Sequence, residues 1–144
     1  MKMMQLLFII LVISRGAYAN DCTSVDEMDK ADNAASAIQD WQGVHSFYMN
    51  YRQCDDGYIS EGMSATIVGL LANKWKTTHQ LIHFSVSDHA FEGWMINHID
   101  TTTDDRELEK VVRYATDNCP EGGTALCGQI KNAAHVALQE LQSQ

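Results

Sequence analysis

The chain has 144 residues, of which 45% are hydrophobic and 20% charged, with 10 Lys and Arg against 19 Asp and Glu. This length suits one compact domain, and this apolar content excludes a wholly disordered chain. The net charge of -9 argues against nucleic acid as a partner, because a surface that binds phosphates needs a basic stripe.

The first 19 residues have the pattern of a secretory signal peptide. Lys2 precedes an apolar run of 8 residues, Leu6–Ile13, and Ala17-Tyr18-Ala19 forms a cleavage site. A retained membrane anchor is the alternative, but this run is too short to span a bilayer, which needs about 20 residues. We therefore expect no stable membrane insertion, residues 20–144 as a single helical domain, and a protein located in the periplasm or secreted.

The first half of this domain shows apolar residues at helical spacing. Trp41, Val44, Tyr48 and Tyr51 predict a first helix over much of residues 28–52. A stronger stripe over residues 59–71 predicts a central helix that ends near residue 75. A row of small residues follows the same helix: Gly62, Ala65, Gly69 and Ala72. Since Gly weakens a helix, this row predicts close approach by a neighbouring helix.

The second half predicts three further helices. One covers residues 91–99 after a start signal at residues 85–88, and the next covers residues 108–115 and stops at Cys119-Pro120. The last covers residues 126–141, with Thr124 as its N-cap. Residues 81–86 fit either a short helix or an extended segment. The sequence therefore predicts an all-α fold, a small bundle of five to six helices stapled by disulfides.

The four cysteines are expected to form disulfides in an exported protein, because disulfides persist in oxidising compartments. Three pairings are open from the sequence alone. The short Pro- and Gly-containing loop between Cys119 and Cys127 favours a local bridge, which leaves Cys22 to pair with Cys54. A metal site built from all four cysteines is disfavoured, because no C-x2-C pair occurs.

Motifs of catalysis are missing from the sequence. It has no G-x-S-x-G, no H-E-x-x-H, no phosphate-binding loop and no dinucleotide fingerprint, so we expect no enzyme and no cofactor. His79 and His83 have the i, i+4 spacing of a zinc pair, with Asp88 or His89 as a third ligand. Such pairs are common by chance in a chain with 6 His, so no metal site is predicted. His98 is interpreted as a histidine at the edge of the core with a local hydrogen bond.

Two acidic clusters precede predicted helices: Asp55 and Asp56, and then Asp104, Asp105 and Glu107. Acids at these positions cap a helix and offset its dipole. Because capping acids point away from the core, we expect both clusters to be exposed and to bind a basic protein partner.

The segment from Cys54 to Gly62, CDDGYISEG, resembles the Cys-x-Gly-Tyr-Ile-x-Gly signature of small periplasmic immunity proteins, with one extra residue on each side of Gly-Tyr-Ile. Those proteins protect bacteria that fire peptidoglycan-amidase toxins through type VI secretion. The resemblance implies an exported, disulfide-bonded, helical and non-enzymatic protein. It also implies that Gly57 starts a helix, that Tyr58 is a packed ring and that Gly62 makes a close helix contact.

The leading hypothesis is therefore an exported binding protein, an immunity or inhibitor protein that masks a basic cell-wall hydrolase. The alternative is a periplasmic carrier of a small ligand or metal, with a pocket formed by aromatic residues: Trp41, Tyr48, Trp75 and Trp94. The sequence leaves open the partner's identity, the face that binds and the oligomeric state, including a homodimer.

Overall fold

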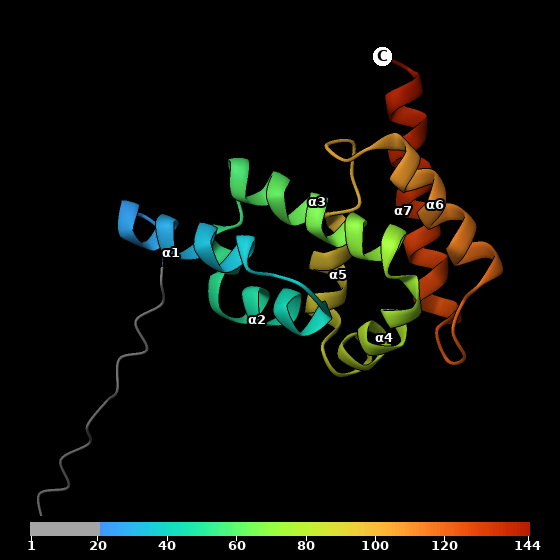
Figure 1. Cartoon of the computed structure of the whole chain (residues 1–144), viewed down its shortest axis with the longest axis horizontal. Helices are drawn as coiled ribbons and strands as arrows, with labels where there is room; N and C mark the ends of the chain where they lie inside the picture. The colour runs from blue at the N-terminus through green and yellow to red at the C-terminus, as the bar shows by residue number, and fades with distance from the viewer. Residues whose placement is uncertain (1–20) are drawn as a thin grey trace, which may run out of the picture.

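The computed structural model describes residues 21–144, so the predicted signal peptide lies outside the described residues. This part of the chain is all-α, as predicted, and contains no strand (Figure 1). It has seven α-helices, where five to six were expected: α1 (Val25–Ser36), α2 (Trp41–Tyr51), α3 (Gly57–Asn73), α4 (Thr78–Ser87), α5 (His89–Asn97), α6 (Asp105–Asp117) and α7 (Thr124–Gln142). Two 3-10 helices, η1 (Arg52–Cys54) and η2 (Trp75–Thr77), precede α3 and α4.

The extra helices arise where the chain breaks an apparently continuous pattern. The single helix predicted over residues 28–52 is wrong, because α1 ends at Ser36 and a new helix starts at Trp41. Asp40 caps the new helix by accepting a hydrogen bond from the backbone N–H of Gly43 at 2.8 Å. The ambiguous segment at residues 81–86 is helical and belongs to α4.

The remaining predicted helices match the structure closely. The central helix is α3, and Asp88 caps α5 by accepting from the N–H of Phe91 at 2.9 Å. Asp104 caps α6 as expected. Thr124 is the first residue of α7 rather than its cap, and the cap position is Gly123.

Both disulfides favoured by chain reach are confirmed. Cys22 is bonded to Cys54, and Cys119 is bonded to Cys127 across the loop between α6 and α7. The first bridge ties the start of the described chain to η1, immediately before α3. The second closes the turn between the last two helices.

The helix α3 runs through the middle of the molecule (Figure 1). The helices α1 and α2 lie toward one end of it, and the pair α6–α7 lies at the other. Along its length α3 contacts both α1 and α6, while α6 and α7 pack against each other. Every one of the seven helices contributes buried side chains to one core, among them Trp41, Ile67, Leu81, Phe91 and Ile130, all 0% exposed.

The small-residue row on α3 does not make the close helix contact predicted for it. A Cβ placed on Gly62 or Gly69 would meet nothing within 4 Å, and Ala65 is exposed. Only Ala72 is buried. The reason is that the apolar stripe of α3, not this row, faces the neighbouring helices.

The roles implied by the resemblance are met in part. Gly57 does start α3, with a φ of +53° that favours glycine. The packed ring expected at Tyr58 is wrong, because this side chain is 54% exposed, and Gly62 lacks the expected close contact. Within residues 21–144, none of the helices is both long and apolar enough to cross a membrane.

Candidate functional site

The two acids before α3 point in different directions. Asp56 is the N-cap of α3, accepts from the N–H of Gly57 at 2.8 Å and is exposed, as predicted. Asp55 turns into the molecule, where its side chain is only 10% exposed. Its Oδ2 accepts from Trp94 Nε1 at 2.6 Å and lies 2.9 Å from His98 Nε2. The expectation that Asp55 is an exposed capping acid is therefore wrong.

The inward position of Asp55 changes its electrostatics. Burial is the largest single influence and acts to raise its pKa, because it disfavours the charged form. The hydrogen bonds from His98 and Trp94, together with the attraction of His98, outweigh this, so the pKa of Asp55 is below its ordinary value. Its second oxygen, Oδ1, is buried and has no hydrogen-bond partner among the described residues.

The contact between Asp55 and His98 is part of a longer buried network. Ser64 Oγ lies 2.9 Å from His98 Nδ1 and donates to Asp100 Oδ2 at 2.8 Å. Since the Ser64 proton goes to Asp100, Ser64 must accept from Nδ1 of His98. Ser64 thus joins the imidazole of His98 to the carboxylate of Asp100 inside the protein.

These residues resemble the groups of a nucleophilic triad, but their setting differs from that of a catalytic site. Ser64 is 1% exposed and His98 4% exposed, so a substrate in solvent cannot reach the hydroxyl. The network instead joins η1, α3, the end of α5 and the turn before α6. His98 is hydrogen-bonded and lies in the core, but the local hydrogen bond predicted for it is wrong, because its partners Ser64 and Asp55 lie 34 and 43 residues away in the sequence.

The acidic cluster before α6 is accessible. Asp104 accepts from the N–H groups of Arg106 and Glu107 and pairs with the Arg106 side chain at 3.3 Å. That side-chain hydrogen bond is the main cause that lowers the pKa of Asp104. Asp105 is exposed, and half-buried Glu107 accepts from Asn73 Nδ2 at 2.8 Å.

The structure separates the two acidic clusters. Asp56 precedes the first residue of α3, while Glu107 bonds the last, Asn73. With a rise of 1.5 Å per residue, the ends of this 17-residue helix lie about 24 Å apart. The clusters therefore form two surfaces rather than one site.

The histidine pair considered for metal binding lies on exposed turns of α4. His79 uses Nδ1 to contact the backbone oxygen of Lys76 at 2.8 Å, and His83 packs edge-on against Phe84. Within residues 21–144, no three His, Cys, Asp or Glu side chains are grouped so as to hold a metal ion. Asp88, considered as a third ligand, caps α5.

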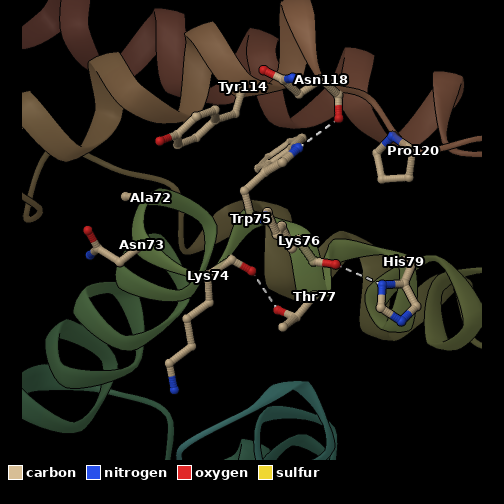
Figure 2. A pocket seen from close by; sticks show the side chains of 10 residues that line it. All are labelled: Ala72, Asn73, Lys74, Trp75, Lys76, Thr77, His79, Tyr114, Asn118 and Pro120. Carbon is tan, nitrogen blue, oxygen red and sulfur yellow. Dashed lines mark hydrogen bonds between the residues drawn. The ribbon is translucent and has the colours of Figure 1, made fainter.

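A cleft of about 690 Å³ lies elsewhere, between η2 and the end of α6 (Figure 2). Trp75 and Tyr114 stack in it, with ring centroids 5.9 Å apart and an interplanar angle of 26°. The predicted aromatic pocket is not formed as expected, because only Trp75 of the four proposed residues lines this cleft. Trp41 and Tyr48 are buried in the core, and Trp94 is half-buried and bonded to Asp55.

Comparisons of the chain with protein families, with curated proteins and with solved structures found no match. The class of the protein is thus described by its fold alone: residues 21–144 form an all-α domain with two disulfides. Two disulfides in a small domain are typical of proteins that work in an oxidising compartment.

Proposed function

We propose that the protein is an exported binding protein that masks a basic cell-wall hydrolase toxin in the periplasm. The observation that carries this proposal is the uneven distribution of charge. Residues 21–61 contain nine acids and two bases, whereas residues 62–144 contain ten acids and six bases. The helix α1 and the start of α3 bring much of the first set to one end of the molecule (Figure 1).

This acidic end also presents an exposed aromatic residue. Tyr58 lines a shallow groove between α1 and α3, together with Asp32, Ala35 and Gly62. Large aromatic side chains are the residue type most enriched among those that dominate binding energy in protein interfaces. Tyr58, with Asp32 in the same groove and Asp56 two residues before it in the sequence, therefore suits the surface of a basic protein.

Electrostatics gives this arrangement a mechanism. An acidic surface attracts a basic partner over a distance of about 8–10 Å at physiological salt, which raises the rate of association. Packing of Tyr58 would then slow dissociation. The segment that resembles the immunity-protein signature, residues 54–62, lies at this same end of α3, which supports the same assignment.

The test is co-expression of residues 20–144, directed to the periplasm, with basic cell-wall hydrolases. We expect rescue from lysis and a complex recovered under non-reducing conditions. No rescue and no complex with any of these hydrolases would contradict the proposal.

Charge variants then locate the surface. Asp56→Asn with Glu61→Gln should slow association a few-fold at low salt, and the loss should shrink as salt rises. The variant Asp104→Ser with Asp105→Asn tests the second cluster in the same way. The matched control is Asp117→Asn with Glu140→Gln, which removes two exposed charges near the ends of α6 and α7. Equal association rates for all three double variants would exclude both acidic clusters as docking surfaces.

A further inference from the structure

The cleft in Figure 2 has the dimensions of a small-molecule site. Its volume is about 690 Å³, within the range of about 300–1,000 Å³ that is usual for ligand pockets. The end of α3, η2 and the start of α4 form one wall, and the end of α6 with the following loop forms the other. The lining residues used below are Lys74, Lys76, His79, Trp75, Tyr114 and Pro120.

One part of this cleft is a fixed aromatic surface. Trp75 stacks on Tyr114, and its Nε1 donates to the backbone oxygen of Asn118 at 2.8 Å (Figure 2). This bond satisfies the only polar atom of the buried indole and holds its orientation. Below it, Thr77 Oγ1 donates to the Lys74 oxygen at 2.7 Å and accepts from Trp41 Nε1, which fixes η2. The aromatic surface is therefore formed before any ligand arrives.

The charge around the cleft is opposite to that of the whole protein. Two lysines and one histidine line it, and no Asp or Glu does, although the chain carries 19 acids against 10 Lys and Arg. Lys76 has no ion-pair partner among residues 21–144. Lys74 contacts the oxygen of Gln39 at 3.0 Å, which occupies one of its three N–H donors.

The acidic residues near the cleft lie outside it and therefore do not neutralise the lysines that line it. Glu107 does not line the cleft. It accepts a hydrogen bond from the side-chain amide of Asn73, which does. Asp117 and Glu121 are neighbours of lining residues in the sequence but do not line the cleft. Arg113 adds a further cation beside Tyr114, with its guanidinium 5.9 Å from the ring centroid. A ligand in this cleft thus meets positive charge and an aromatic surface together.

We infer that the cleft binds a small aromatic carboxylate. Its ring packs on Tyr114 and on the edge of Trp75, which is 8% exposed, beside Pro120, and its carboxylate pairs with the ammonium group of Lys76. Flat rings and charge-assisted contacts are the interactions that this combination of side chains favours. This inference is independent of the proposed function, because the cleft lies at the end of α3 opposite the acidic end.

The test is an NMR titration of residues 20–144 with indole-3-acetate, with backbone and indole N–H signals followed. A probe of this size is expected to bind with a Kd of about 1 mM. Signals of Trp75, Thr77 and Asn118 should shift. Two matched probes separate the contributions: indole-3-acetamide has the same ring without the charge, and cyclohexylacetate has the charge without the aromatic ring. Both should bind more weakly.

Variants assign the contacts. Lys76→Gln should weaken indole-3-acetate binding about two- to five-fold and leave indole-3-acetamide unaffected. Lys131→Gln, the same change on an exposed lysine of α7, should leave both unaffected. Tyr114→Leu keeps an apolar side chain and should remove the preference for the aromatic probe over cyclohexylacetate. Equal binding of the acid and the amide, shifts outside the cleft, or no shifts at 10 mM probe would each overturn the inference.

Discussion

Asp55 and Asp56 form a natural matched pair for testing the structure. The substitutions Asp55→Asn and Asp56→Asn change the same atoms at adjacent positions. From the sequence both acids are capping residues, for which Asn is an adequate substitute. In the structure, Asp56 is exposed and caps α3, whereas Asp55 is enclosed and bonded to Trp94 and His98.

The expected magnitudes follow from these contacts. In Asp55→Asn one acceptor oxygen remains, the negative charge facing His98 is lost, and an N–H group replaces the second oxygen. A hydrogen bond to a charged group contributes about 1.5–3 kcal/mol, so we expect Asp55→Asn to lower the free energy of unfolding by about 2–4 kcal/mol. For a chain of this size that is a fall in Tm of about 8–16 °C. Asp56→Asn should change the free energy of unfolding by less than about 0.5 kcal/mol.

Urea unfolding followed by far-ultraviolet circular dichroism at pH 7, without reductant, measures both variants. A repeat at low pH adds a second readout. Because the pKa of Asp55 is lower in the folded than in the unfolded protein, its stabilisation is complete above the ordinary Asp pKa of about 3.9. It is lost as pH falls through the folded-state pKa, so the difference between wild type and Asp55→Asn should shrink near pH 2. Equal midpoints for the two variants at pH 7 would refute the inward position of Asp55.

Three further predictions concern the fold and use the same unfolding assay. Gly62→Ala and Gly69→Ala should each raise stability by about 0.5–1 kcal/mol, because a Cβ there meets nothing within 4 Å; a loss of stability would restore the close-contact hypothesis. Gly57→Ala should instead lower stability by about 1–2 kcal/mol, because its φ is +53°, and an unchanged midpoint would contradict this backbone conformation. Cys119→Ser with Cys127→Ser should cost about 2.6 kcal/mol on the chain-entropy estimate, and reductant should then have a smaller effect on the variant than on wild type.

The features predicted correctly from the sequence depend on short stretches of chain. The loop from Cys119 to Cys127 is short enough for its ends to meet, which decided the disulfide pairing. The caps at Asp88 and Asp104 act on backbone groups within three residues. The break between α1 and α2 was missed because apolar residues recur on both sides of it at spacings that one helix would also give.

The features that were missed depend on residues far apart in the sequence. Nothing in the local pattern distinguishes Asp55 from Asp56, and the partners of Asp55 lie 39 and 43 residues further along the chain. Trp75 and Tyr114, which form the aromatic surface of the cleft, come from different elements joined only by the packing of the helices. Such contacts follow from the tertiary arrangement, which helical periodicity does not specify.

The buried hydrogen-bond network of Asp55, His98, Ser64 and Asp100 connects the segments that carry the two acidic clusters. Asp55 is adjacent to the cap of α3, and Asp100 lies four residues before Asp104, the cap of α6. Ser64 and His98 connect these two carboxylates through the interior of the protein. The charge of Asp55 is therefore used inside the protein to fix the start of α3, while the charge of its neighbour Asp56 remains available at the surface. Under the proposed function, partner binding falls to Asp56 and stability to Asp55, so separate substitution of the two residues distinguishes these roles.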